Sequence, residues 1–545
     1  MKFASFFISI WIFSTFPSFS QNIPVGTPLL ENIYRRLQNK GEADTNCSFT
    51  IRPVNLKFTN DSVSGLLHTF FPLLNRIGHS VLKDRASILL LPLTIKQQYD
   101  SHHPYGWNDG SMIPAKGYQN QLSFGIYTKL GPLSIQIRPE IVYAENAGFS
   151  TLPISWSDSI LKSYYYVANR IDNPEKFGNK SYLKLFPGQS SVRINLGKLS
   201  FGLSTENLWW GPGIRNSLVM SNNAAGFPHI SFNTTEPVQT KAGSFEWQII
   251  SGKLQGSGII PVDTTQTING KNLYEAKHED ARRYLNGMIV TWKPKWTKGL
   301  YLGFTNTFYL YQSDMQPGIK SYLPIFGFLF KSKLRSEDYR TDQMLSLFFR
   351  LVLEKENAEV YGEFGKNDNA LNLIDLLLEP EHARAYILGI RKTFITRNQK
   401  DLELFFETTQ LQNSSTQQLR FLEGWYTHYQ VRHGYTQLGQ VIGAGIGPGG
   451  NSQILGMNWI KGIKDIGVSL ERVVHNNDFY YEAFGPLRDI GSHWVDVSLN
   501  MQKNWLKKRF IYSANLSIVR SLNYHWKNDN HVNNLHASMN ISYLF

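Results

Sequence analysis

Two segments of the sequence combine tryptophan rings, amide side chains and conformationally permissive glycine and proline. The first begins with Trp209 and Trp210 and continues through Asn222 and Asn223 to His229. Flat aromatic faces can stack on the C–H faces of sugar rings, and amides can both donate to and accept from sugar hydroxyls. These five residues are therefore predicted to form or position a polysaccharide-contacting surface.

The second segment runs from Tyr105 to Gly117 and carries Trp107, Asn108 and Asp109. It offers the same chemistry with a carboxylate added, so these three residues are predicted as a weaker second group of the site. The alternative is structural, because tryptophans also form girdles at membrane interfaces or hold loops inside a barrel. At this point both interpretations stay open.

The elements that must position these segments are strands, and the end of the sequence shows this most clearly. From Asn534 to Phe545 polar and apolar side chains alternate, with Leu544 as the single lapse. An outer-membrane barrel needs this alternation, because lipid covers its outer face and water or polar groups fill its lumen. Tyr543 and Phe545 also look like the signal that bacterial barrel-assembly machinery reads. This strand is expected to close against a first wall strand near Leu89–Lys96, and an edge strand of a soluble sandwich is the alternative.

The N-terminal sequence predicts export. Lys2 precedes an apolar run from Phe3 to Phe16, and a small-x-small motif ends at Ser20. We therefore predict a signal peptide over residues 1–20 and a mature protein that begins at Gln21, with a retained signal anchor as the alternative. No later apolar stretch reaches about 18 residues, which excludes helical membrane spans.

The mature chain changes its hydrophobic period near residue 86. In residues 21–85 a helix start at Thr27-Pro28, a helix end at Gly41 and a second helical pattern over Leu66–Leu82 predict a helical plug on the periplasmic side. Residues 86–545 show hairpins of alternating residues. At about 10 residues per strand plus turns and long outer loops, they predict an all-β transmembrane β-barrel of about 16–18 antiparallel strands.

Charged residues recur within these strands and are expected to line a wet or network-filled lumen. They are Arg193, Arg350, Glu354, Glu363, Arg391, Glu403 and Asp496. A barrel of this size leaves an open channel unless loops or the N-terminal helices block it. The formal net charge of +13 favours lipopolysaccharide phosphates and acidic polysaccharides as partners of an exported protein, and it makes nucleic acid an unexpected partner.

Catalytic and metal-binding patterns are weak in this sequence. Cys47 is the only cysteine and the histidines form no H-E-x-x-H, so neither metal nor cofactor is expected. Gly445–Gly450 matches G-x-G-x-x-G by spacing, but its proline and the polar residues after it fit a loop. Ser492 and His493 face opposite sides of a strand and cannot pair as nucleophile and base. We therefore predict no enzyme.

A pair of carboxylates such as Glu206 and Glu236 keeps one catalytic alternative open, a barrel hydrolase that cleaves glycosides. The sequence gives no distance between the two groups, and acidic residues also line the lumens of barrels that do no chemistry.

Three runs of the sequence carry a family resemblance: WWGPG with SNNAAGFPH, YGWNDG with IPAKG, and GIGPGGNS. They resemble the capsule assembly proteins of the Wzi family in its Bacteroidetes-type form, and the resemblance covers Tyr105 to Phe545. It implies an outer-membrane barrel of about 18 strands with helices at its periplasmic end. It also implies a surface lectin, not an enzyme, that attaches or organises capsular or exopolysaccharide.

The expectation is thus a monomeric, occluded barrel in the bacterial outer membrane that binds capsular or exopolysaccharide at the cell surface. The first alternative is an open porin or saccharide channel. A porin would have a short N-terminus and one long constricting loop, whereas this chain has a long helix-like segment before its strands.

Overall fold

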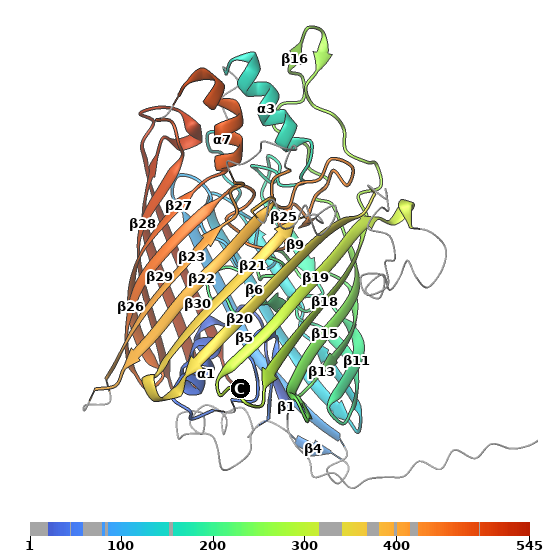
Figure 1. Cartoon of the computed structure of the whole chain (residues 1–545), viewed down its shortest axis with the longest axis vertical. Helices are drawn as coiled ribbons and strands as arrows, with labels where there is room; N and C mark the ends of the chain where they lie inside the picture. Colours follow the sequence, from blue (N-terminus) through green and yellow to red (C-terminus); the bar gives the residue numbers. More distant parts are fainter. Residues whose placement is uncertain are drawn as a thin grey trace, which may run out of the picture.

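The computed structural model shows a closed antiparallel β-barrel of 18 strands (Figure 1). The residues that the structure describes are 20–43, 45–57, 79–81, 86–151, 156–315, 340–367, 381–396, 400–414, 423–489 and 491–545. The predicted signal peptide lies outside them except for Ser20, and so does most of the second predicted helix. The expected fold class is confirmed.

The wall strands follow one another in chain order around the barrel. They are β5 (Ala86–Asp100), β6 (Gly117–Leu130), β7 (Leu133–Ile137), β8 (Glu140–Ala144), β9 (Tyr182–Phe186), β10 (Ser191–Leu196), β11 (Leu199–Ser204), β13 (His229–Thr234), β15 (Gly243–Leu254), β18 (Arg283–Pro294), β19 (Leu300–Tyr311), β20 (Asp342–Leu353), β21 (Ala358–Asn367), β22 (Arg384–Phe394), β23 (Asp401–Gln410), β26 (Asn451–Lys461), β27 (Lys464–Val474), β28 (Val495–Lys507), β29 (Phe510–Leu522) and β30 (Val532–Tyr543). Both β7 and β8 pair with β6, while β9 pairs with β8 and β10 with β7, so each couple fills one wall position.

The barrel closes where β30 pairs with β5. Their register runs from Tyr543 opposite Leu93 to His536 opposite Asp100. The expected partner strand is confirmed, and the paired stretch lies about four residues further along β5 than the sequence predicted. The pairing of β5 with β6 shifts register between Leu91 and Thr94. The alternation of polar and apolar residues in the sequence could not show where this shift occurs.

The outer face of the wall is apolar. Leu455 on β26 is 59% exposed and Leu470 on β27 is 57% exposed, and similar aliphatic side chains recur around the barrel. In water such a continuous surface would be unfavourable, whereas lipid covers it at no cost. The protein is therefore an outer-membrane β-barrel. Among the described residues no helix is both long and apolar enough to cross a membrane.

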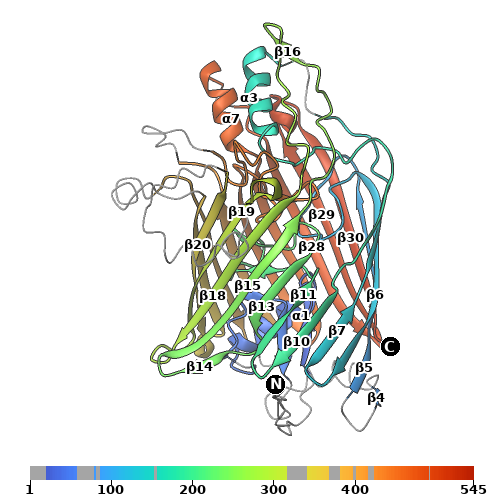
Figure 2. The same cartoon turned by 90° about the vertical axis from the view of Figure 1, so that its right-hand side faces the viewer.

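The two ends of the barrel differ in the length of their connections (Figure 2). One end has mostly short turns and holds the C-terminus, while the other carries long loops with α3 (Asp158–Ala168) and α7 (Asn477–Ala483). Outer-membrane barrels place short turns in the periplasm and long loops outside. The end with α3 and α7 is thus the extracellular end.

The remaining elements of the described residues are short strands, one α-helix and 3-10 turns. They are β1 (Ser20–Ile23) paired with β3 (Val54–Lys57), β2 (Ile51–Arg52) paired with β12 (Trp209–Trp210), β4 (His79–Val81), β14 (Val238–Thr240), β16 (Thr267–Ile268) paired with β17 (Lys271–Asn272), β24 (Thr436–Gln437) paired with β25 (Gln440–Val441), α1 (Pro28–Asn39), and the 3-10 turns η1 (Gln312–Asp314), η3 (Glu354–Glu356), η4 (Gly485–Leu487) and η5 (Tyr524–Trp526).

The first predicted helix is confirmed as α1, which lies inside the periplasmic end of the barrel (Figure 1). Pro28 occupies its first turn, and Gly41 follows its end with a φ of 69°. The second predicted helix lies outside the described residues, apart from three residues that form the strand β4 and pair with β5. The domain boundary near residue 86 stays a prediction, although β5 begins there.

Ion pairs fix α1 to the wall. Arg35 contacts Glu359 on β21 at 2.7 Å, and Arg36 contacts Glu403 on β23 at 3.0 Å and Asp465 on β27 at 2.9 Å. Of the predicted lumen charges, these are buried: Arg193, Arg350, Glu363, Arg391, Glu403 and Asp496. The prediction for Glu354 is wrong, because β20 ends at Leu353 and Glu354 lies in the exposed turn η3.

The extracellular half of the lumen holds a packed apolar core, which the prediction of a wet or network-filled interior missed. Two outer segments, residues 205–228 and 423–450, fold inward and meet apolar side chains of the wall. The core includes Trp210, Leu218, Val219, Met220, Trp425, Tyr426, Val431, Tyr435 and Val441 from the loops and Ile250, Leu285, Ile289 and Tyr309 from the wall. Loops therefore pack into the extracellular half of the lumen, and α1 lies at its periplasmic end (Figure 1).

Candidate functional site

The two tryptophan-containing segments meet inside the barrel. The Asn222 amide donates to the carbonyl of Asn108 at 2.8 Å, and the backbone N–H of Gly110 donates to the carbonyl of Asn222 at 2.8 Å. Asn108 in turn donates through its side chain to the carbonyl of Arg215 at 2.8 Å. Each amide thus satisfies a backbone carbonyl of the other segment, which locks the two loops together.

The third run, GIGPGGNS, packs against both segments. A Cβ on Gly445 would lie 2.5 Å from Oδ1 of Asn223 and 2.5 Å from Cβ of Trp107, so only glycine fits there. Asn223 also donates to the carbonyl of Val441 at 2.8 Å. The sequence runs that carry the family resemblance therefore come together as one unit, here called the motif cluster: Trp107–Asp109, Trp209, Trp210, Asn222, Asn223 and Gly445.

Several predicted contact residues are buried within this unit. Trp210 is 0% exposed and donates through Nε1 to Gln248 at 2.7 Å, so neither of its ring faces is open to a sugar. Asn223 and His229 are also buried, and the ring of His229 contacts the carbonyl of Phe227 at 2.8 Å. The sequence left open whether these residues contact the polysaccharide or position the loops that do. Their burial supports the positioning role.

Arginine side chains pack on the rings of the other two tryptophans of the motif cluster. The guanidinium of Arg52 lies 4.2 Å from the ring centroid of Trp209, and that of Arg215 lies 3.9 Å from the ring of Trp107. Such cation–π contacts stabilise each ring by about 0.5–2 kcal/mol. Since Arg52 comes from the N-terminal segment, the stack on Trp209 joins that segment to the motif cluster.

Some residues of the motif cluster still face open space. Trp107, Asn108, Asp109, Trp209 and Asn222 line a cavity of about 360 Å³, here called the lumen cavity. The opposite side of the lumen cavity is formed by α1 and by amides and hydroxyls of β26 to β30. Five of the eight residues predicted to bind polysaccharide thus line the lumen cavity. The other three, Trp210, Asn223 and His229, do not.

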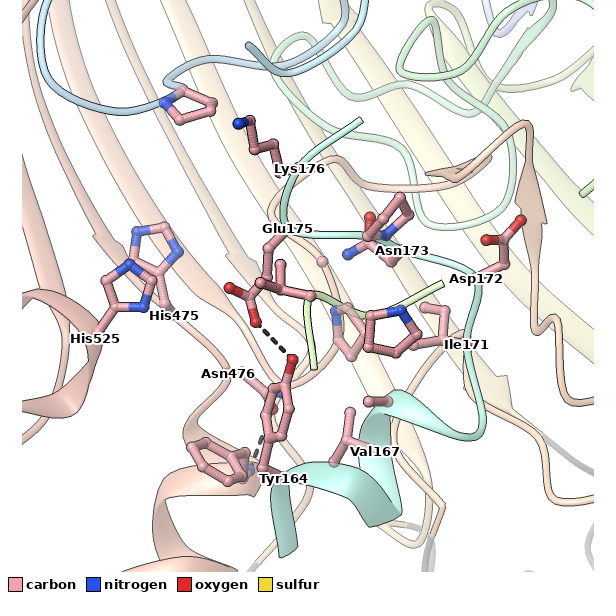
Figure 3. A pocket seen from close by; sticks show the side chains of 18 of the residues that line it. Tyr164, Val167, Ile171, Asp172, Asn173, Glu175, Lys176, His475, Asn476 and His525 are labelled. Carbon is pink, nitrogen blue, oxygen red and sulfur yellow. Dashed lines mark hydrogen bonds between the residues drawn. The ribbon is translucent and has the colours of Figure 1, made fainter. Parts of the chain in front are cut away.

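A second cavity lies at the extracellular end and is here called the outer pocket (Figure 3). Its volume is about 300 Å³. The hydroxyl of Tyr164 on α3 donates to Oε1 of Glu175 at 2.6 Å, and these two side chains face each other across the view in Figure 3. Asn173 is exposed and Lys176 half-buried beside them. Hydroxyl, carboxylate, amide and ammonium groups therefore converge on one concave surface.

An aromatic cluster lines another side of the outer pocket. Trp494 packs against His475 at 4.0 Å and against Tyr524 at 5.1 Å between ring centroids, and Trp526 packs on Phe479 at 4.8 Å. Asp496 fixes Trp494 and His475 by accepting from Trp494 Nε1 at 3.1 Å and by contacting His475 Nε2 at 2.8 Å.

Two histidines of the outer pocket are held neutral. Burial lowers the pKa of His525 to about 3 and that of His103 to about 4. Both rings line the outer pocket. Because they carry no charge at neutral pH, they contribute apolar ring surface, and the positive charge of the pocket comes from Lys176 and Lys277.

The chemistry of the outer pocket is that of saccharide recognition. Aromatic faces pack on sugar C–H groups, while carboxylate, amide and ammonium groups satisfy hydroxyls. Sequence reasoning missed these residues because they come from separate loops. A signal was present in the runs Tyr164-Tyr165-Tyr166 and Tyr524-His525-Trp526, which are dense in rings at loop positions.

The catalytic candidates are separated or engaged elsewhere. Glu206 follows the extracellular end of β11, whereas Glu236 lies in the turn after the periplasmic end of β13, so they cannot flank one bond. Ser492 donates to Asp489 at 2.7 Å, and the ring of His493 contacts Asn477 at 2.7 Å. Within the described part of the chain, no group of three or more His, Cys, Asp or Glu is placed to hold a metal ion.

The sequence model of a protein family described as capsule assembly protein Wzi matches residues 100–533. The chain belongs to this family. The matched Wzi region spans nearly the whole barrel wall, the three runs of the motif cluster and the loops of the outer pocket. No curated protein matches the chain in sequence.

One solved structure agrees with the Wzi assignment in fold, and two others match with lower TM-scores. Wzi of Escherichia coli, an outer-membrane protein involved in group 1 capsule assembly and described as a carbohydrate-binding β-barrel, matches with a TM-score of 0.62 and 13% identity, covering 96% of this chain and 99% of that chain. OccAB2 of Acinetobacter baumannii matches with a TM-score of 0.41 and 11% identity, covering 84% of this chain and 98% of that one. OprD of Pseudomonas aeruginosa matches with a TM-score of 0.38 and 8% identity, covering 84% and 94%.

A buried carboxyl beside the outer pocket gives a test of its local structure. Asp478 in the first turn of α7 accepts from the backbone N–H of Asn413 at 2.9 Å, and burial raises its pKa from 3.8 to about 7. The folded protein therefore binds this proton more tightly than the unfolded chain. The resulting stability is complete below about pH 4 and is lost as the pH rises through about 7.

We expect Asp478→Asn to raise the melting temperature at pH 8 and to leave it nearly unchanged at pH 4, because the amide cannot ionise. Thermal scans of the purified barrel across this range measure the effect. Asp158→Asn on α3 is the matched control, since it makes the same substitution at an exposed position. An equal effect of Asp478→Asn on the melting temperature at both pH values would show that ionisation of this carboxyl is not linked to unfolding.

Proposed function

We propose that this protein binds capsular or exopolysaccharide at the cell surface through the outer pocket and thereby helps to hold or assemble the capsule. The observation that carries the proposal is the lining of the outer pocket. Tyr164, Glu175 and Lys176 lie next to an aromatic cluster, and all of them face a cavity at the extracellular end of an outer-membrane barrel.

Membership of the Wzi family supports the proposal, since that family is described by capsule assembly. The E. coli Wzi structure, described as a carbohydrate-binding barrel, has the same fold. We further propose that the chain acts as a monomer in a lipopolysaccharide-containing outer membrane, after insertion by the barrel-assembly machinery.

The motif cluster takes the positioning role in this proposal. It holds residues 205–228, residues 101–116 and residues 423–450 together, and Ile446 and Pro448 of the last segment also line the outer pocket. Trp107, Asn108, Asp109, Trp209 and Asn222 face the lumen cavity and could contact a chain end that enters it. Trp210, Asn223 and His229 brace the loops from behind.

In this function the protein catalyses no reaction and forms no open channel. A hydrolase would need the two carboxylates of a catalytic pair on opposite sides of one bond, and Glu206 and Glu236 lie at opposite ends of the wall. A porin would need a continuous aqueous path, and the apolar core formed by the two inward loops lies across the lumen.

Substitutions in the outer pocket should weaken glycan binding without loss of stability. Loss of one stacking ring commonly costs about 1–3 kcal/mol in the comparable case of nucleic-acid bases, so Tyr164→Ala should weaken retention on immobilised capsular polysaccharide about tenfold or more. Lys176→Gln should weaken binding to acidic glycans, and the difference from wild type should shrink at high salt. Glycan retention and thermal stability are measured on the same preparations.

Trp210→Ala and Asn223→Ala are the comparison variants. We expect both to lower the melting temperature, because Trp210 is wholly buried, and to bind normally in the fraction that remains folded. The opposite pattern, with stable Trp210→Ala protein that has lost binding and Tyr164→Ala protein that binds normally, would move the glycan site from the outer pocket to the motif cluster.

A further inference from the structure

Two rows of side chains run horizontally across the outer face of β26 to β30. The upper row, here called the arginine row, consists of Gln453, Arg472, Val497, Arg520 and Asn533, each directly opposite the next in strand register. A second row, here called the aliphatic row, lies two residues closer to the periplasm on each strand. It consists of Leu455, Leu470, Leu499, Ile518 and Leu535, paired in the same way.

The aliphatic row faces lipid. Ile518 is 51% exposed and Leu535 is 41% exposed on the outer wall. Along β29 the outward-facing residues below this row, Leu516, Ala514 and Tyr512, are all apolar. Tyr512 lies eight residues from Arg520, which is about 27 Å along the strand at 3.3–3.4 Å per residue. With a strand tilt of about 40°, this corresponds to about 20 Å of membrane thickness, near the height of the apolar band of such barrels. The arginine row therefore lies at the outer boundary of that band.

The two arginines are held in place by neutral groups. Arg472 donates through Nη1 to Oδ1 of Asn451 at 3.0 Å and to Oε1 of Gln453 at 2.7 Å. Arg520 donates through Nη1 to Oδ1 of Asn533 at 2.9 Å. These amides orient both guanidinium groups while their charge remains uncompensated.

Two other arginines near the extracellular end are compensated. Arg282 pairs with Asp280 at 2.7 Å and Arg432 with Glu275 at 2.6 Å. Within the described part of the chain, no carboxylate forms an ion pair with Arg472 or Arg520. Two exposed, oriented and unpaired guanidinium groups at a membrane boundary are suited to an external anion.

We propose that the arginine and aliphatic rows form a binding site for a phosphorylated glycolipid of the outer leaflet, the lipid A part of lipopolysaccharide. Arg472 and Arg520 lie two strand spacings apart, about 10 Å, so both long side chains reach one headgroup. Guanidinium groups bind phosphate oxygens through paired hydrogen bonds. The aliphatic row directly beneath takes the acyl chains, which distinguishes a lipid from free phosphate. This site is independent of the outer pocket and of glycan binding there.

Native mass spectrometry of the detergent-purified barrel tests the site with three probes: lipid A, the same lipid A with its phosphates removed, and inorganic phosphate. We expect the wild-type protein to bind phosphorylated lipid A about tenfold or more tightly than the dephosphorylated lipid. Inorganic phosphate at a large excess should not displace it, because it cannot use the aliphatic row. Equal binding of the two lipids, or displacement by phosphate, would overturn the proposal.

Substitutions locate the site on this face. The double variant Arg472→Gln and Arg520→Gln should lose the preference for the phosphorylated lipid. The double variant Arg282→Gln and Arg432→Gln removes the same charge from arginines that already have carboxylate partners, and it should bind as wild type. Heat-modifiable gel mobility confirms that each variant is folded. A preference that survives in the first variant or disappears in the second would contradict the assignment.

Discussion

Deletion of Tyr543–Phe545 should abolish assembly of the folded barrel in the outer membrane. Tyr543 pairs with Phe510 on β29 and with Leu93 on β5, and the backbone N–H of Leu544 donates to the carbonyl of Arg509 at 2.8 Å. The ring of Phe545 packs on Tyr543 with 5.2 Å between centroids. These contacts hold the terminal aromatic pair at the periplasmic rim, where the barrel-assembly machinery would read it. Heat-modifiable mobility of outer-membrane fractions measures folded protein.

The design separates a terminal signal from barrel closure. After the deletion, β30 and β5 still pair from His536 to Ser542, so closure alone should survive. The variant Tyr543→Ala with Phe545→Ala keeps the strand and removes only the rings, and we expect it to fail as well. Met539→Ala, which removes a side chain from the middle of the same strand, is the control. Folded protein of normal abundance after the deletion would show that these residues are not needed.

Removal of two of the three segments that lie in the lumen should raise the conductance of the barrel. One segment is α1 with β2, and the other is loop 205–228, which meets β2 through β12 and through the bond from Gly211 N–H to the carbonyl of Thr50 at 2.8 Å. A barrel of this strand number has room for an aqueous channel once it is emptied. Planar-bilayer recordings should show small conductance for the intact chain and an increase of about tenfold or more for the double deletion.

Single deletions should have smaller effects, because each segment fills a different half of the lumen. Deletion of Pro28–Lys57 leaves the apolar core of the loops in place. Replacement of residues 205–228 by an Asn-Gly turn is compatible with the wall, since Ser204 and His229 already pair across β11 and β13. Large steady channels from the intact protein would favour the porin alternative, and a folded double deletion without conductance would contradict the assignment of the plug.

Some of the fold followed from local sequence pattern. The alternation at residues 534–545, the helix start at Thr27-Pro28 and the change of period near residue 86 each depend on side chains a few residues apart. Such patterns report which face of an element is apolar, and the structure has α1, β5 and β30 where they predicted them. Leu544, the lapse in the alternation, is buried beyond the end of β30, which is why it did not follow the pattern.

The site depended on contacts that no local pattern encodes. Tryptophan and amide types alone could not show that Trp210 would be sealed inside the lumen while Trp494, which carried no motif, would border the outer pocket. Whether a ring is exposed depends on how the long loops fold back into the barrel, and loop 205–228 packs against both residues 423–450 and the wall.

The sequence by itself determined the class of the molecule: an exported chain, alternating strands, a helix before them and three runs that mark its family. Tertiary structure decided what lies in the lumen, which rings are open and which charges stay unpaired. Arg472 and Arg520 are 48 positions apart in the chain, and only strand register brings them into one row. The physical reason is that periodicity is a property of neighbouring residues, whereas burial and pairing depend on segments that meet only when the barrel closes.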